Sequence, residues 1–538
     1  MFKENRKLFF WIAGLGLLTY IWTVFFGFTY LDDQSLILDN LFFLKNLGNI
    51  PTAFVTDVFR ILHVPTAYYR PLLTVSFMFD AQLSGSNPFF YHLTNVIIHV
   101  ATSCVVFIFL QKIKIKEEVA FLLSAIFAVH PVLSQAVAWI PGRNDSLLTL
   151  FSLLSFVFSI NFVESGKSRD IIWHIVFFAA ALLTKESALL VAPLIVLYYL
   201  LFERKQIMSE KSYVAFAWVA ITGVWYLLRT VALQNPIKYT LAEGFASIYQ
   251  SLPAVLIDLG KVFFPFNLSV LPIIQDSTLV WGAITIVLLL VFIILSKKRN
   301  NKMIIFGAVW FLAFLITSFI RPDKQYVPDF LEHRIYLPII GLFMILGEID
   351  FVKKFSFSRK INLTVVGTLL GVLIVVNLVH TLVFRDKTVF WESAVSTSPH
   401  HPLAHKNLGA MYYLDGNLDK AEIEYKKTLE LNPQEPMIHN NLGLIFAARG
   451  DLTKAKEEYK KELEINPQYS NALFNYGIVL YREGKTSEAE KMWLETLKVN
   501  PDHIDAIKNL FILYYQNKDL NRAGYYYTEL QKRGINLQ

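Results

Sequence analysis

Two adjacent acids, Asp32 and Asp33, follow the first long apolar segment of this 538-residue chain, in the stretch GFTYLDDQSLILDN. A carboxylate can take a proton from a hydroxyl group or stabilise positive charge that develops at a sugar carbon. Acids at the edge of an apolar segment can also be merely solvated. The choice between these interpretations depends on which side of a membrane the acids face and on what gathers around them.

Further ionisable side chains lie at the ends of later apolar segments, in motifs such as YYRPLL, WIPGRND, LLTKES and LEHRIYLP. Charged groups at membrane depth are costly and often mark a site, although ion pairs and helix ends retain them too. Arginine and lysine can hold a phosphate leaving group, so acids beside cations are equipped for glycosyl transfer from a lipid phosphate. The candidate residues for the donor phosphate and its site are Arg70, His92, His130, Arg143, Asp145, Lys185, Glu186, Arg229, Glu332, His333 and Arg334.

A metal site is an alternative use of some of these residues. Asp32, Asp33 and His92, with His99, could supply ligands. The histidines lack a compact ligand motif such as HExxH, however, and helix packing explains the face of His92 and His99 equally well. We therefore expect that the chain requires no metal and no other cofactor.

Composition identifies the chain as a polytopic membrane protein with a soluble tail. It is 54% hydrophobic, and apolar runs of about 20 residues recur through the first 384 positions. The single Cys104 excludes an intrachain disulfide. We expect an irregular interfacial or re-entrant helix over 243–272. The eleven expected spans lie near 8–28, 91–111, 118–136, 145–163, 171–184, 187–202, 212–230, 279–296, 303–320, 335–350 and 361–384.

The distribution of charge predicts the orientation of these spans. Residues 1–384 contain 30 lysines and arginines against 22 acids, and 19 of the 30 lie in six alternate short loops. This asymmetry places the N-terminus in the cytosol, and it places Asp32, Asp33 and everything after residue 384 on the other side. Residues 385–538 carry 20 basic against 21 acidic residues, which excludes a basic tail that binds nucleic acid.

The tail has a strict 34-residue period, seen in Leu408-Gly409, Leu442-Gly443 and Tyr476-Gly477. Alanine, an aromatic residue and proline recur at fixed offsets, the signature of tetratricopeptide repeats. The predicted fold is all-α. Its predicted domains are a transmembrane domain over 1–384, a half-repeat connector helix over 385–401 and four repeats over 402–538.

Position six of each repeat is asparagine: Asn407, Asn441, Asn475 and Asn509. We expect these four amides to form a ladder along the concave groove. An amide both donates and accepts hydrogen bonds, so the ladder could hold the backbone of an extended acceptor peptide. The alternative is that these residues brace neighbouring helices, because asparagine inside a helix is unfavourable without a partner.

The motif series FTYLDDQSLILDN, YYRPLLTVSFMFDAQLSG, AVHPVLSQAVAWIPGRNDSLL, ALLTKESALL and LEHRIYLPIIG resembles, in order and spacing, the transmembrane and tetratricopeptide-containing O-mannosyltransferases of the GT-C class. The resemblance implies a dolichyl- or polyprenyl-phosphate sugar donor and transfer with inversion to serine or threonine hydroxyls, usually without metal. It implies that Asp32 and Asp33 are catalytic. The asparagine ladder is similar to one in the repeat domain of O-linked N-acetylglucosamine transferases, which implies peptide capture.

We therefore expect an integral-membrane glycosyltransferase that moves mannose to proteins on the non-cytosolic face. Its partners would be the bilayer, the lipid-linked sugar and an acceptor protein bound by the repeats, with no nucleic acid. It would lie in the plasma or inner membrane of a prokaryote or in the endoplasmic reticulum of a eukaryote. Two alternatives remain: a transferase for a lipid or glycan acceptor, and a non-enzymatic membrane scaffold for envelope or secretion assembly.

Overall fold

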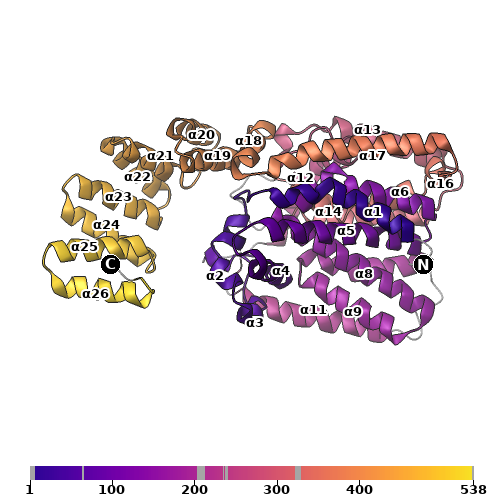
Figure 1. The fold of residues 1–538 in the computed structure, drawn as a ribbon, viewed down its shortest axis with the longest axis horizontal. Helices are drawn as coiled ribbons and strands as arrows, with labels where there is room; N and C mark the ends of the chain where they lie inside the picture. Colours follow the sequence, from indigo (N-terminus) through magenta and orange to yellow (C-terminus); the bar gives the residue numbers. More distant parts are fainter. Residues whose placement is uncertain are drawn as a thin grey trace. The chain divides into compact units, whose positions relative to one another are not determined.

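The computed structural model describes residues 6–62, 66–202, 212–233, 236, 240–320 and 329–535. Within these ranges the regular elements are helices, and one isolated bridge joins Ile273 to Asp329. The chain divides into two compact units, Met1–Ser398 and Pro399–Gln538 (Figure 1). The predicted class, an all-helical membrane bundle followed by a helical repeat, is confirmed.

The first unit is a bundle of apolar helices. Five helical segments of the described chain are long and apolar enough to cross a membrane: Arg6–Phe25, Phe89–Lys112, Ile140–Ser165, Tyr213–Ala232 and Lys360–Phe384. A pair bent by 52°, Glu117–Val129 and Pro131–Ala138, makes a sixth if it counts as one span. The principal helices are α1 (Arg6–Tyr20), α5 (Phe89–Lys112), α6 (Glu117–Val129), α7 (Ser134–Ala138), α8 (Arg143–Ser165), α9 (Ser168–Leu182), α10 (Val191–Phe202), α11 (Ser212–Ala232), α12 (Leu241–Phe263), α13 (Val280–Leu295), α14 (Asn301–Thr317), α15 (Ile339–Leu346) and α17 (Lys360–Thr381).

Each expected span contains helix, but the number of eleven crossings stays a prediction. The segment expected over 335–350 is wrong as one continuous span, because α15 has only eight residues and the short α16 (Asp350–Lys353) follows it. Pro338 occupies the N-cap of α15 and Gly347 its C-cap. These residues are apolar because they are buried in the bundle. Their hydropathy alone therefore does not distinguish a buried segment from a membrane span.

The segment expected to form an interfacial helix over 243–272 contains α12, which ends at Phe263 and gives way to a loop. Thr240 and Glu243 form a capping box at its start. A Cβ atom on Gly260 would lie 2.7 Å from the backbone nitrogen of Gly282, so glycine allows α12 and α13 to touch. Their close contact fixes the loop between them beside the site described below.

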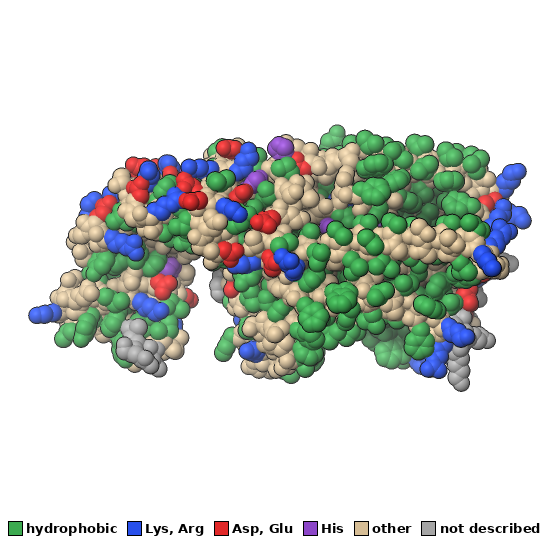
Figure 2. All heavy atoms as spheres, turned by 45° about the horizontal axis from the view of Figure 1, so that its top comes forward, with side chains coloured by type: hydrophobic (Ala, Val, Ile, Leu, Met, Phe, Trp, Pro, Cys, Tyr) green, Lys and Arg blue, Asp and Glu red, His purple; other side chains and the backbone are tan. Residues whose placement is uncertain are grey.

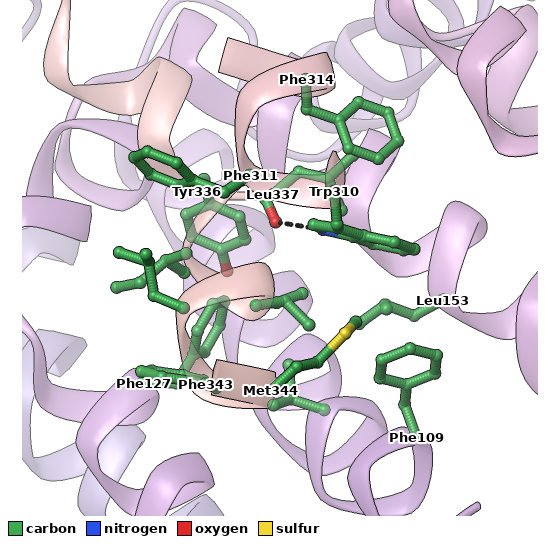
Figure 3. Close-up of a cluster of buried hydrophobic side chains, with 14 of the residues drawn as sticks. Phe109, Phe127, Leu153, Trp310, Phe311, Phe314, Tyr336, Leu337, Phe343 and Met344 are labelled. Carbon is green, nitrogen blue, oxygen red and sulfur yellow. Dashed lines mark hydrogen bonds between the residues drawn. The ribbon is translucent and has the colours of Figure 1, made fainter. Parts of the chain in front are cut away.

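The core behind that site is aromatic (Figure 3). Trp310 of α14 is fully buried, and its indole N–H donates to the backbone oxygen of Leu337 at 3.0 Å. Phe314 lies on α14 as well, one turn along, while Phe109 of α5 and Met344 of α15 come from other helices in the same cluster. This packing fixes the segment just before α15, which carries site residues.

A second, smaller hydrophobic core is built mainly from the stretch of sequence between α1 and α5. This stretch forms α2 (Leu41–Leu44), α3 (Ile50–Ala53) and α4 (Pro71–Ser84). Leu36, Ile37 and Phe77 are buried in it. The stretch after Asp32 and Asp33 is therefore folded against α4 and is not a solvated loop.

The second unit consists of helix pairs: α19 (Pro402–Leu414) with α20 (Leu418–Leu431), α21 (Ile438–Ala448) with α22 (Leu452–Ile465), α23 (Ser470–Arg482) with α24 (Thr486–Val499), and α25 (Ile504–Gln516) with α26 (Leu520–Lys532). A Cβ on Gly409 would lie 2.7 Å from the ring of Tyr425, and one on Gly443 would lie 2.5 Å from that of Tyr459. The glycine of the repeat is therefore required for helix contact.

The expected connector helix exists as α18 (Lys387–Thr397), and it packs within the first unit. Trp391 donates from its indole to the backbone oxygen of Thr29 at 3.0 Å. The hydroxyl of Ser398 donates to the backbone oxygen of Leu271 at 2.7 Å. These contacts set the boundary between the units at Ser398 rather than at residue 384 or 401.

Candidate active site

Asp33 is the fixed member of the acidic pair. It is 1% exposed, and its Oδ2 accepts hydrogen bonds from the backbone N–H of Thr29 at 2.6 Å, from the Thr29 hydroxyl at 2.6 Å and from the N–H of Tyr30 at 3.2 Å. Tyr30 has a φ of 61°, which turns the chain back over the carboxylate. Burial raises the pKa of Asp33 to about 6, while the bonds from Thr29 oppose that rise.

Asp32 is the less buried member of the pair. It is half-buried, and its carboxyl group has no hydrogen-bond partner within the described chain. Burial raises its pKa to about 7, with further increases from Asp33 and Asp329. Arg70 and Arg334 act in the opposite direction, so both cations lie within electrostatic reach of this carboxyl. Asp32 thus has the properties of a general base that works near neutral pH.

Three cations lie in the region of the Asp32 carboxyl, and each is paired with a different acid. The Nε of Arg70 lies 3.8 Å from Glu186, and the Nη2 of Arg334 lies 3.3 Å from Asp329. The ammonium of Lys185 donates to both oxygens of Asp145 at 2.8 Å. The three side chains remain 13–15% exposed, so they border open space instead of being sealed in the core.

The three cations also act on one another. Burial lowers the pKa of Lys185, Asp145 opposes this, and Arg70 and Arg334 lower it further. Arg70 at the N-cap of α4, Lys185 in the turn after α9 and Arg334 in the segment before α15 therefore converge on one region. A divalent anion is the ligand that such a group of cations recognises.

His333 adds a neutral imidazole to this region. Its Nδ1 and its backbone N–H both lie near the Oε1 of Gln135, at 3.2 and 3.1 Å. The amide of Gln135 is oriented by its donation to the backbone oxygen of Val270 at 2.9 Å. Nδ1 is then the protonated nitrogen, and Nε2 lies 3.7 Å from Asp145. Burial holds the pKa of His333 well below its usual range, and Lys185 lowers it further.

Arg143 does not lie with this group, contrary to the expectation that it could hold the phosphate. It is 0% exposed, pairs with Asp80 at 2.6 Å, and donates to Asn95 Oδ1 at 2.6 Å and to the backbone oxygen of Tyr91 at 2.7 Å. Ser76 accepts a further bond at 3.0 Å. Arg143 thus holds α4, α5 and α8 together, and these contacts use four of its five N–H donors.

Four more of the expected residues have structural contacts. His92 and His130 contact the backbone oxygens of Gly27 and Val262 through Nε2, at 3.3 and 2.9 Å. Arg229 donates to the backbone oxygen of Ala67 at 3.3 Å. Glu332 is fully buried and accepts from Lys261 and from the N–H of Ser269, both at 2.7 Å. These side chains thus link separate segments of the first unit.

The sequence did not single out Asp329, Thr29 or Asp80. Asp80 lies inside a quoted motif, and its charge within an apolar helix was a usable signal. The sequence contains no comparable signal for Thr29 or Asp329. The contact of Thr29 depends on the turn at Tyr30, and that of Asp329 depends on the path of the chain toward Arg334. Among the described residues, His, Cys, Asp and Glu side chains form no group of three that could hold a metal ion.

The asparagine ladder of the second unit has two kinds of member. Asn475 donates to Asn440 Oδ1 at 2.9 Å, and Asn440 donates to Asn441 Oδ1 at 3.2 Å. Asn441 in turn bonds to Tyr425. Asn407 and Asn509 have no hydrogen-bond partner in the part of the chain that the structure describes, and both are half-buried.

Comparison with known families gives three matches. Residues 72–228 match the family of dolichyl-phosphate-mannose-protein mannosyltransferases. Residues 402–435 and 424–470 match tetratricopeptide repeats. The first match covers Arg143, Asp145 and Lys185 and begins just after Arg70.

Curated relatives cover more of the chain. Protein O-mannosyl-transferase F38B6.6 of Caenorhabditis elegans is 26% identical over 384 residues, which is 68% of this chain and 54% of the relative. Protein O-mannosyl-transferase TMTC4 of Mus musculus is 26% identical over 66% of this chain and 57% of its own. Protein O-mannosyl-transferase TMTC3 of Homo sapiens is 31% identical over 37% of this chain and 22% of its own. The chain thus spans about half the length of the worm and mouse relatives, and less of the human one.

Similar solved structures include a tetratricopeptide repeat domain. The type IV pilus biogenesis factor PilW is 26% identical over 28% of this chain and 70% of its own, with a TM-score of 0.26. The first repeat domain of Spaghetti (RPAP3), bound to an HSP90 peptide, is 21% identical over 22% of this chain and 93% of its own, with a TM-score of 0.21. By these family matches and curated relatives, the chain is similar to dolichyl-phosphate-mannose-protein mannosyltransferases in its first unit, to tetratricopeptide repeats in its second, and to protein O-mannosyl-transferases over about two thirds of its length.

Proposed function

We propose that this chain transfers mannose from a polyprenyl- or dolichyl-phosphate donor to serine or threonine hydroxyls of proteins. One observation carries the proposal: Asp32 presents a carboxyl without a hydrogen bond, within electrostatic reach of two arginines that border open space. A base beside an anion site is what transfer from a lipid phosphate to a hydroxyl requires.

In the proposed reaction, Asp32 takes the proton of the acceptor hydroxyl as its oxygen attacks the anomeric carbon of the sugar. The bond between that carbon and the phosphate oxygen breaks, and the lipid phosphate leaves with the electron pair. Attack on the face opposite the phosphate inverts the anomeric configuration. Arg70 and Arg334 stabilise the negative charge on the departing phosphate, with Lys185 beside them.

In this proposal Asp33 and Asp145 are positioning residues, which act by holding other groups of the site in place. Asp33 is held by three hydrogen bonds and fixes the turn that presents Asp32. Asp145 holds the ammonium of Lys185 and lies 3.7 Å from His333. Glu186 similarly positions the backbone N–H of Tyr69 at 3.2 Å, next to Arg70. We propose that no resident metal takes part, since positively charged side chains supply the counter-charge.

We propose that the N-terminus is cytosolic and that the site lies on the opposite side of the membrane. Figure 2 supports this orientation, because lysine and arginine side chains gather at the end of the first unit where α16 lies in Figure 1. An impermeant thiol reagent applied to right-side-out vesicles tests it. In a Cys104→Ser background, Ser487→Cys is expected to react at once and Ser358→Cys only after permeabilisation; the reverse pattern would invert the orientation.

The second unit recruits the acceptor in this proposal. Tetratricopeptide repeats bind extended segments in a groove, and the amides of Asn407 and Asn509 are available for such a segment. The first unit would then carry the chemistry and the second the choice of substrate. This division agrees with family matches that fall separately on the two units.

The test is Asp32→Asn in purified enzyme supplied with a polyprenyl-phosphate mannose and an acceptor protein. Loss of a positioned base is expected to lower turnover by about 10²–10⁴-fold. Asp39→Asn is the matched control, because Asp39 is an exposed acid of the same stretch, and it is expected to retain full activity. Near-normal turnover of Asp32→Asn would refute the assignment, and sugar found on lipid instead of protein would refute the proposed acceptor.

A further inference from the structure

A hollow of about 340 Å³ lies next to the candidate active site, between the end of α12, the start of α13 and the loop that joins them. This is a volume at the low end for small-molecule sites. One wall is aromatic, formed by Phe264 and Trp281 with ring centroids 5.0 Å apart. The other walls carry side chains that are able to form hydrogen bonds: Asn267, Asp276, Thr278 and Thr397.

The charges around the hollow do not favour an anion. Lys261 is the cation among the lining residues, and its ammonium already donates to the buried Glu332 at 2.7 Å. A phosphate would have to compete with that carboxylate and would also meet the acid of Asp276. The lining therefore suits a neutral ligand.

The aromatic residues do not favour a quaternary ammonium headgroup either. Such a cation is held in a cage of rings that face one another. Here Phe264, Phe266 and Trp281 pack together on one side, with centroid separations of 5.0 to 6.3 Å. They present a single apolar wall, which suits the flat apolar face of a ring compound.

The polar wall can both donate and accept hydrogen bonds. The amide of Asn267 is exposed and has no partner within the described residues. The Thr278 oxygen accepts from the N–H of Val280 at 3.3 Å and keeps its own proton to donate. A ligand with several hydroxyl groups around an apolar face matches this combination of amide, hydroxyl and carboxylate beside rings.

The hollow is connected to the active site through Glu332. Glu332 Oε1 accepts bonds from the Lys261 ammonium and the Ser269 N–H, both on residues that line the hollow. The next two residues, His333 and Arg334, belong to the candidate active site. A ligand in the hollow therefore lies against the same support that fixes the cation proposed to hold the donor phosphate.

We propose that this hollow is a second sugar subsite, which binds a neutral pyranose ring already attached to the acceptor. Binding of the ring depends only on the geometry of the hollow, whereas its use on a glycosylated acceptor rests on the proposed function. The enzyme would then distinguish acceptors that already carry sugar from bare ones, without a change in the transfer chemistry.

The first test measures binding without catalysis, by saturation-transfer NMR of the purified full chain with methyl α-mannopyranoside. Transfer to the ring protons is expected, with affinity at least about tenfold weaker in the Asn267→Ala, Thr278→Ala double variant, which loses two hydrogen bonds. Trp281→Phe is expected to weaken binding less than Trp281→Leu. Asn471→Ala, an exposed asparagine of the second unit, is the matched control and should bind as wild type.

Asp32→Asn must also bind the pyranoside normally, so failure of the proposed catalytic role leaves this test intact. No transfer to any pyranoside, unchanged binding in the double variant, or transfer to phosphocholine in place of the sugar would each overturn the subsite. In a turnover assay, the double variant is expected to lose its preference for a mannosylated over a bare acceptor peptide. Equal loss on both acceptors would mean that the hollow only supports Glu332.

Discussion

At the scale of single residues, the two members of the acidic pair differ in environment, which is why we propose different roles for them. Asp33 is held by the turn at Thr29 and Tyr30, and Asp32 is left without a hydrogen bond beside Arg70. The two neighbours thus differ in environment despite equal chemistry. The resemblance seen in the sequence implies a catalytic role for the pair, but the different environments of its two members could not be predicted, because they depend on the left-handed turn at Tyr30.

The pKa of Asp32 predicts a pH dependence. A base must be deprotonated, so kcat/KM is expected to rise with pH through about 7 and to level above it. Asp329→Asn removes a negative charge that raises this pKa and also releases Arg334 to act on Asp32. The rising limb of the pH–rate profile should therefore move to lower pH. Asp39→Asn should leave the limb in place, and an unmoved limb in Asp329→Asn would contradict the electrostatic assignment.

Arg143 and Arg334 offer a contrast between an arginine that supports the fold and one that we propose binds the donor phosphate. Arg143→Lys cannot replace three directed bonds in a buried site, and breaking a buried pair costs about 3–5 kcal/mol. We expect a lower midpoint of thermal unfolding in detergent. Arg334→Lys should unfold like wild type but bind the donor more weakly. The opposite pattern would exchange the two roles.

At the scale of helices, the apolar segments were predictable because burial in lipid or protein demands apolar residues over whole turns. The lengths of the helices were not predictable in the same way. The segment around Ile339 is apolar for protein packing, and it forms a helix of eight residues. Arg143 was expected near a span end facing the site, yet its partner Asp80 is 63 positions away in sequence, beyond any local pattern. Asp32 with Arg70, Lys185 and Arg334 could be listed from sequence, but their convergence required the fold.

The contact between α14 and α15 positions the segment that carries Arg334. A Cβ on Gly307 would lie 2.5 Å from the backbone oxygen of Gly341, which cannot move aside without shifting α15. Gly307→Ala is therefore expected to destabilise the chain by about 1–3 kcal/mol and to lower transfer activity. Gly367→Ala on α17 is the control, since nothing lies within 4 Å of its Cβ, and it should change stability by no more than about 1 kcal/mol. Equal effects of the two changes would exclude helix contact as the cause.

At the scale of the whole chain, two units with different physical chemistry serve one proposed reaction. The first is a bundle of apolar helices that buries a limited number of polar side chains; the second alternates charges along paired helices. A lipid-linked donor needs the first kind of surface, because its tail stays in the membrane. An unfolded protein segment needs the second, because its backbone must find hydrogen-bond partners in water.

The last prediction separates capture of the acceptor from support of the repeats. Asn407 and Asn509 have no hydrogen-bond partner in the described chain, whereas Asn441 and Asn475 are linked through Asn440. Asn407→Ala with Asn509→Ala should keep the unfolding temperature and lower kcat/KM for a protein acceptor by about tenfold, because bonds to the acceptor backbone are lost.

Asn441→Ala with Asn475→Ala should instead destabilise the second unit by about 1 kcal/mol for each bond removed. Both double variants should transfer normally to a short soluble peptide, since such a substrate reaches Asp32 without the groove. If the Asn407 and Asn509 pair loses stability and all activity together, these amides are structural after all. If it loses nothing, the acceptor is held by some other surface of the repeats, and the groove has no part in bringing hydroxyl groups to the base.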